Sequence, residues 1–164
     1  MFPAWCKAWH AAQGGSTVTA APAVVVHNAA QARLALAAAG PCGVVLLSAT
    51  GAAASLGPAW FRAIVLAAAA AHPAARWDAM LDCGAAAGLA LAALRGGFCH
   101  LVLEPASPAF VRLGLVAAAA GGVVLGARPA ALDLGRIDAT RPGGQAMLAR
   151  WLQKTPDDTR EPTR

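Results

Sequence analysis

The sequence predicts an α/β protein organised on a parallel β-sheet, and three observations support this fold class. Short apolar runs alternate with longer segments rich in helix-forming residues, which is the order that parallel strands and crossover helices produce. Runs such as residues 24–26 and 44–47 are continuously apolar, as strands buried on both faces are. Glycine, proline and helix-capping residues separate the runs, so each run has a clear end.

The first predicted strand covers residues 24–26 and ends at His27 and Asn28. Asn28 is followed three residues later by Gln31, a spacing typical of a capping box, in which two side chains satisfy backbone N–H groups at a helix start. This spacing predicts a helix that runs to about residue 39, where Gly40 and Pro41 end it.

The second strand covers residues 44–47 and leads into a long loop over residues 48–57. Pro58 suits the first position of the next helix, because that position needs no backbone N–H, and the helix closes before His72. A third strand follows at residues 78–82, and its helix ends at Gly96.

The fourth strand covers residues 100–104, and Ser107 with Pro108 provides an N-cap and first turn for the helix after it. Residues 123–125 form the fifth strand. Beyond Arg128 the pattern weakens into a loop, and residues 144–153 are expected to form a last amphipathic helix.

These elements predict a five-stranded parallel sheet, and a doubly wound, flavodoxin-like arrangement is the first expectation. Half of a (β/α)8 barrel is the alternative, because strand order leaves no local trace in the sequence. We expect an N-terminal arm over residues 1–20, whose aromatic side chains dock on the domain or on a partner, one α/β domain over residues 21–153, and a disordered polar tail over residues 154–164.

The composition predicts unusually apolar helix exteriors. Apolar residues make up 58% of the chain and charged residues only 13%, about half the usual share, and alanine occupies many of the remaining positions. Either alanine stands on the helix exteriors because its exposure to water costs little free energy, or another subunit covers the helices. We therefore expect a homo-oligomer or a protein partner.

Other classes of function are disfavoured by charge, hydropathy and cysteine spacing. The net charge of +5 comes from arginines spread along the chain, which argues against a nucleic-acid partner, and no apolar stretch is long enough for a membrane span. The four cysteines lack metal-binding spacing, so no metal or other cofactor is predicted. We expect reduced thiols and a cytoplasmic location, because no export signal is recognised.

Candidate functional residues are those at the carboxyl ends of the predicted strands, where parallel α/β sheets bind ligands. The predicted ligand-binding residues are His27, Asn28, Ser48, Thr50, Gly84, Glu104 and Arg128, and the predicted catalytic residue is Asp82. The same residue types are also needed simply to cap helices and form turns, and a cap for the following helix is the alternative role of Asp82. No glycine-rich nucleotide motif occurs.

Three of these strand ends resemble those of response-regulator receiver domains over residues 22–134. The first strand runs into a polar pair, the third ends in Asp82, and the fifth is followed by Arg128 and a proline. The resemblance implies that Asp82 matches the phosphoacceptor and that Arg128 stands at the place of the family's lysine. His27 and Asn28 replace the family's magnesium-binding acidic residues, which implies a pseudo-receiver that acts without magnesium-dependent phosphorylation.

Two functions therefore remain open. The first is a non-catalytic interaction or regulatory domain, pseudo-receiver-like, that acts through self-association or a protein partner. The second is a small transferase or lyase that acts on a phosphorylated or carboxylated molecule, with Asp82 as acid/base and with Thr50 and Arg128 as contacts for the small anionic ligand.

Overall fold

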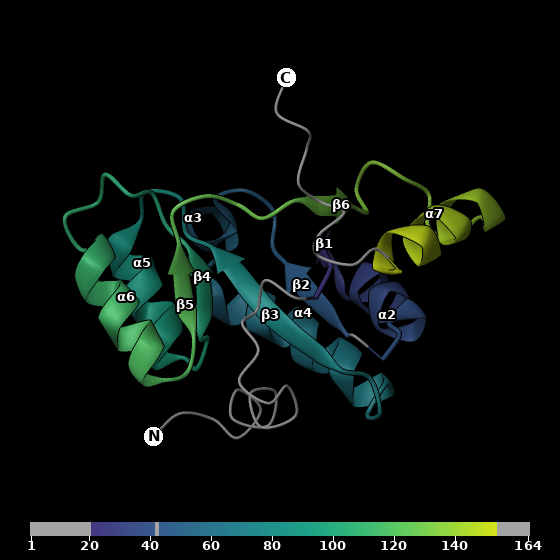
Figure 1. Ribbon diagram of the computed structural model, residues 1–164, viewed down its shortest axis with the longest axis horizontal. Coiled ribbons are helices and arrows are strands. Elements are labelled where there is room, and N and C mark those ends of the chain that lie inside the picture. The colour runs from purple at the N-terminus through teal and green to yellow at the C-terminus, as the bar shows by residue number, and fades with distance from the viewer. Residues whose placement is uncertain (1–20, 42, 154–164) are drawn as a thin grey trace.

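Helices and strands alternate along the chain in the computed structural model, which describes residues 21–41 and 43–153 (Figure 1). The strands are β1 (Ala23–Val25), β2 (Val44–Leu47), β3 (Trp77–Asp82), β4 (His100–Val102), β5 (Val123–Leu125) and β6 (Ala131–Asp133). The helices are α2 (Ala29–Ala38), α3 (Ala52–Leu56), α4 (Pro58–Ala71), α5 (Ala87–Arg95), α6 (Phe110–Ala119) and α7 (Pro142–Leu152). The expected N-terminal arm and C-terminal tail lie outside the described residues.

Two of the predicted helix starts, those of α2 and α4, are found where they were expected. The predicted N-cap Ser107 is wrong, because α6 begins at Phe110 with Ala109 as its N-cap and has no side-chain cap. The Asn28 side chain accepts from Gln31 N at 2.9 Å, which is one half of the expected capping box of α2. The Gln31 side chain accepts from His27 N at 2.8 Å, one residue before the N-cap, so the second bond of the box goes to His27 and not to Asn28. Pro58 occupies the first turn of α4, after Gly57 at φ 81°, a left-handed conformation that glycine adopts readily.

The α/β class and the parallel sheet are confirmed. Every strand pair is parallel, and the sheet order is β5-β4-β3-β2-β1-β6, with six strands where five were predicted. The sixth strand, β6, was missed because its three residues follow Pro129 in a stretch that is only half-buried. The short helix α3 was likewise expected to be loop.

The strand order determines where the helices lie. From β1 to β5 each strand lies beside its predecessor, so all crossovers step in one direction, whereas the flavodoxin-like order is 2-1-3-4-5. A half-barrel shares this stepwise order, but its next strand would lie beside β5, and β6 lies beside β1. Crossovers of one hand that step in one direction place their helices on one face of the sheet. Helices α7, α2, α4, α5 and α6 contact one another in that sequence and form a single layer (Figure 1).

Side chains from the two faces of the sheet form two separate apolar clusters. Alternate strand residues, such as Val24, Leu46 and Leu81, pack with the helices in the larger cluster. Their neighbours point the other way, as the alternation of side chains along a strand requires. The second cluster consists of Ala23, Val25, Val45, Leu47, Met80 and Val102.

The chain returns from β5 to β6 through residues 126–130, here called the crossing segment. Figure 1 shows it running along the carboxyl ends of the strands, from one edge of the sheet toward the other. It carries Arg128 and Pro129. This segment therefore brings a cation to the edge where the predicted site residues lie.

Candidate functional site

Arg128 reaches from the crossing segment to the ends of β2 and β3. Its Nη1 pairs with Asp82 Oδ2, and its Nη2 donates to Ser48 O at 2.9 Å. The Arg128 side chain is 26% exposed, whereas that of Asp82 is 3% exposed. A guanidinium held by two partners and open on its remaining side has a fixed orientation toward solvent.

Asp82 connects three separate loops. Its Oδ1 accepts from Gly51 N at 3.0 Å and from Gly84 N at 2.9 Å, and its Oδ2 binds Arg128. Its own backbone N donates to Ser48 Oγ at 2.9 Å. Because three donors already engage the carboxylate, the geometry favours loop anchoring over proton transfer.

Two glycines make this arrangement possible. Gly51 has φ 63° and Gly84 has φ 51°, both in the left-handed region where other residues are strained. A Cβ at Gly84 would lie 3.8 Å from the Gly51 Cα, so the two loops pass in van der Waals contact. Gly84 therefore contributes loop geometry and a backbone N–H.

His27 and Asp133 form a second polar pair beside β1 and β6. His27 Nε2 lies 2.7 Å from Asp133 Oδ1, which also accepts from Gly135 N at 2.8 Å. Burial acts to raise the pKa of Asp133, but hydrogen bonds from His27 and Gly135 and the positive charges of His27 and Arg136 outweigh it and leave that pKa below the usual 3.8. Asp133 is therefore an ionised carboxylate whose Oδ1 is already engaged by His27 and Gly135.

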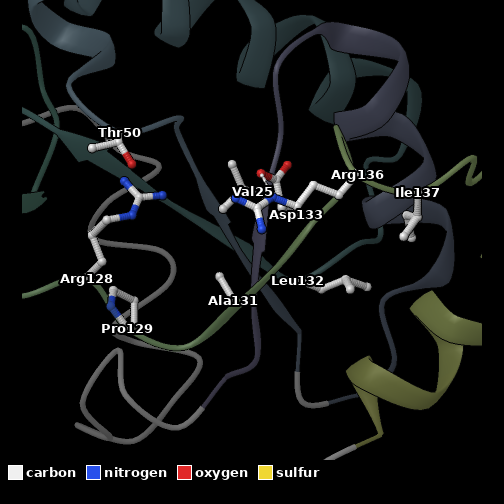
Figure 2. Close-up of a pocket in the computed structure, with 9 residues that line it drawn as sticks. All are labelled: Val25, Thr50, Arg128, Pro129, Ala131, Leu132, Asp133, Arg136 and Ile137. Atoms are coloured by element: carbon white, nitrogen blue, oxygen red, sulfur yellow. Dashed lines mark ion pairs between the residues drawn. The ribbon is translucent and has the colours of Figure 1, made fainter.

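A pocket of about 420 Å³ lies where the strand order reverses, between β1 and β6. Open α/β sheets bind ligands at such reversal points, outside the carboxyl ends of the strands. Figure 2 shows Arg128 and Arg136 extending toward each other from the two sides, with the Thr50 hydroxyl directed at the Arg128 guanidinium. The lining residues are Val25, Thr50, Arg128, Pro129, Ala131, Leu132, Asp133, Arg136 and Ile137.

The structure brings together some of the predicted site residues and separates others. Ser48, Asp82, Gly84 and Arg128 share one hydrogen-bond network, and Thr50 lines the adjoining pocket. His27 reaches the pocket only through its pair with Asp133, and Asn28 caps α2. Glu104 is exposed, and only its backbone N joins the network's edge, by donating to Gly84 O at 2.8 Å.

Asp133 and Arg136 were missed by sequence reasoning. Both follow β6, whose short run gave no strand signal, so neither was recognised as a strand-end residue. The available signal was the pattern of two apolar residues before Asp133 and a turn glycine at Gly135 after it.

The described cysteines behave differently from each other. Cys83 is a free, buried thiol, and burial, together with the charge of Asp82, raises its pKa to about 12. It is thus protonated at neutral pH and a poor nucleophile. Cys99 is disulfide-bonded, so the prediction of a reduced thiol is wrong there. Disulfides are rare in the cytoplasm, so Cys99 does not support the expected cytoplasmic location, which stays a prediction.

Within residues 21–41 and 43–153, no three His, Cys, Asp or Glu side chains are placed to hold a metal ion together. None of the helices in these ranges combines the length and apolar character needed to cross a bilayer.

No protein-family model, no curated protein and no solved structure matches this chain. The resemblance to receiver domains therefore rests on the strand-end residues alone. The residue at the phosphoacceptor position, Asp82, is engaged by Arg128 and two backbone N–H groups, and the strand order differs from the 2-1-3-4-5 order of such domains.

Proposed function

We propose that this protein is a non-catalytic ligand-binding domain whose pocket between β1 and β6 binds a small phosphorylated or carboxylated molecule. The observation that carries the proposal is the position of Arg128, which is fixed by Asp82 and Ser48 while it lines the pocket. Two of its five N–H donors are used in these contacts, so the others remain for a ligand. Prior fixation lowers the entropic cost of binding an anion.

The pocket also suits an anion that has an apolar part. Arg128 and Arg136 supply two positive charges, and Asp133 is already engaged by His27. Val25 and Ile137 provide apolar lining, and the volume of about 420 Å³ fits a small metabolite. A ligand with an acidic group and a short hydrocarbon body satisfies both parts of the lining.

Binding without chemistry is favoured over the transferase or lyase alternative. The carboxylate of Asp82 is occupied by three donors, and the Cys83 thiol has a pKa of about 12. His27 is hydrogen-bonded to Asp133. A catalytic role for Asp82 as acid/base would require it to exchange Arg128 for a substrate.

The test is calorimetric titration with inorganic phosphate, sugar phosphates, and mono- and dicarboxylates of increasing chain length. Arg136→Ala should lower the affinity about tenfold or more, since a hydrogen bond to a charged group contributes roughly 1.5–3 kcal/mol. Arg141→Ala is a matched control, because Arg141 is also exposed and pairs with an aspartate three residues earlier but does not line the pocket. Equal losses in both variants, or no binding by the intact protein, would refute the proposal.

A second candidate function, self-association, is favoured by α6. This helix ends the helix layer and lies beside β5, an edge strand. Val111 and Leu115 are four residues apart, so they share one face, and they are 70% and 68% exposed. Arg112 is the one charged residue between Glu104 and Arg128. An apolar surface with a single charged residue is typical of a subunit contact.

Sedimentation velocity over a wide concentration range tests this second candidate. The protein should dimerise, and Leu115→Lys should yield a folded monomer. Met147→Lys is the control, because Met147 is an exposed apolar residue on α7, at the opposite end of the helix layer. A monomer at all concentrations would exclude self-association.

A further inference from the structure

Asp133 has one carboxylate oxygen engaged and one oxygen open. Its Oδ1 accepts from Gly135 N at 2.8 Å and lies 2.7 Å from His27 Nε2. No described residue donates a hydrogen bond to Oδ2, whose ion-pair partner, Arg136 Nε, lies 3.6 Å away and beyond hydrogen-bond length. The Asp133 side chain is 29% exposed and lines the pocket between β1 and β6. A bound molecule can therefore reach an oxygen that is free to accept a hydrogen bond.

The charge of Asp133 selects the kind of donor that suits this oxygen. Burial acts to raise the pKa of Asp133, but the hydrogen bonds from His27 and Gly135 and the nearby positive charges hold it below 3.8, so the carboxylate is ionised at neutral pH. Hydrogen bonds between two charged groups are stronger than those between neutral ones. An ammonium group is therefore a better partner for Oδ2 than a hydroxyl group.

The charged side chains around the pocket balance one another. Arg128 pairs with Asp82, and Arg136 pairs with Asp133, so two positive and two negative groups sum to zero. His27 adds a positive charge only when it is protonated. A ligand with negative charge alone would be attracted by the arginines and repelled by Asp133. A ligand that carries both signs avoids this repulsion.

The cation and the carboxylate stand apart on the pocket lining. Figure 2 shows the Arg128 guanidinium, on the crossing segment, and the Asp133 carboxylate, at the end of β6, as separate groups. Their ion-pair partners are Asp82 and Arg136, so the two groups do not pair with each other. Val25, the register partner of Asp133 on β1, also lines the pocket. A molecule that contacts both charged groups thus has apolar lining for its hydrocarbon part.

We propose that the pocket binds a small free amino acid, whose carboxylate pairs with Arg128 and whose ammonium group donates to Asp133 Oδ2. This inference rests on the proposed function, because it names the class of carboxylated molecule that the pocket takes. The apolar lining, which includes Val25 and Ile137, contacts the hydrocarbon part of the amino acid. A simple carboxylate lacks the donor and a simple amine lacks the acid group, so neither satisfies both charged groups.

Calorimetric titration of the intact protein with matched ligands tests the ammonium contact. The probes are carboxylic acids of three to six carbons in three forms, which carry an amino group, a hydroxyl group or neither, at C2 or at the end of the chain. The best amino acid should bind about tenfold or more tightly than its unsubstituted counterpart, and more tightly than its hydroxy counterpart.

The failure of this inference is distinguishable from the failure of the proposed function. Equal binding of the three forms, tighter binding of the hydroxy acid, or binding of phosphates alone would overturn the amino-acid assignment and leave the proposed ligand-binding function standing. No binding of any carboxylate or phosphate would refute both.

The variant Asp133→Asn tests whether Asp133 is the group that recognises the ammonium. The amide keeps the shape of the carboxylate and removes its charge, so the preference for the amino acid should fall to within about twofold. Affinity for the unsubstituted acid should hold or rise, because a repulsive charge is lost. Asp138→Asn is the control and should keep the full preference, since Asp138 also pairs with an arginine three residues later but does not line the pocket.

The measured quantity is the ratio of two affinities on the same protein, so a loss of stability in Asp133→Asn does not imitate the expected result. An undiminished preference in Asp133→Asn, or an equal loss in Asp138→Asn, would overturn the proposal.

Discussion

Removal of the Asp82 carboxylate tests how the carboxyl edge of the sheet is held together. Asp82→Ala deletes the acceptor for Gly51 N, Gly84 N and Arg128, at a side chain that is 3% exposed. Breaking a buried ion pair by removing one partner costs about 3–5 kcal/mol. At roughly 2–4 °C per kcal/mol for a chain of this size, the melting temperature should fall by about 10 °C.

A double-mutant cycle separates the ion pair from the loop contacts. Chemical denaturation of Asp82→Ala, Arg128→Ala and the double variant should give a coupling of about 1.5 kcal/mol or more, because the two side chains are in direct contact. The exposed pair of Asp138 and Arg141, 3.0 Å apart, is the control and should show no measurable coupling. Additive losses at Asp82 and Arg128 would refute the view that one anchors the other.

Three further predictions concern pH, packing and reactivity. The folded-state pKa of Asp133 lies below 3.8, so its contribution to stability is present above that pH and is lost as the pH falls through the lowered value. Asp133→Asn should therefore weaken the dependence of the melting temperature on pH in this acid range, as thermal unfolding at several pH values would show. Gly122→Ala should unfold the protein at a lower denaturant concentration, because its Cβ would lie 2.0 Å from Cys99 O, whereas Gly114→Ala, with open space on α6, should stabilise it by up to about 1 kcal/mol. Cys83 should resist iodoacetamide at pH 7.5 until the chain unfolds, as alkylation followed by mass spectrometry would show; rapid native labelling would contradict its buried, protonated state.

Local chemistry made the elements predictable. The capping pair of Asn28 and Gln31, the Pro58 start of α4 and the continuous apolar run of β2 each act through neighbours in sequence, so their patterns are visible before folding. Strand order is set instead by packing between distant segments. The position of β6 beside β1 therefore had no signal, and Asp133 and the pocket were missed with it.

Several residues of the candidate site were predictable from the sequence, but the contacts between them were not. Asp82 and Arg128 were both recognised as strand-end residues, because a polar side chain after an apolar run marks such an end. Their contact depends on the crossing segment, which spans the sheet edge and joins residues 46 positions apart. Nothing in either local sequence specifies that path.

If the proposed ligand binds in the pocket, Arg128 serves both the stability of the fold and the binding of the ligand. Its guanidinium donates inward to Asp82 and Ser48 and also lines the pocket. A ligand on its outer face binds a cation that the fold has already oriented, so loss of Asp82 should weaken binding even though Asp82 is not a lining residue. Arg136 lacks this inward anchor, since its Nε lies 3.6 Å from Asp133 Oδ2 and its side chain is 86% exposed. Changes at Arg136 should therefore lower the affinity for a ligand with little change in the free energy of unfolding. Changes at Arg128 should lower both. If neither change lowers affinity, the residues of the pocket only hold the loops together.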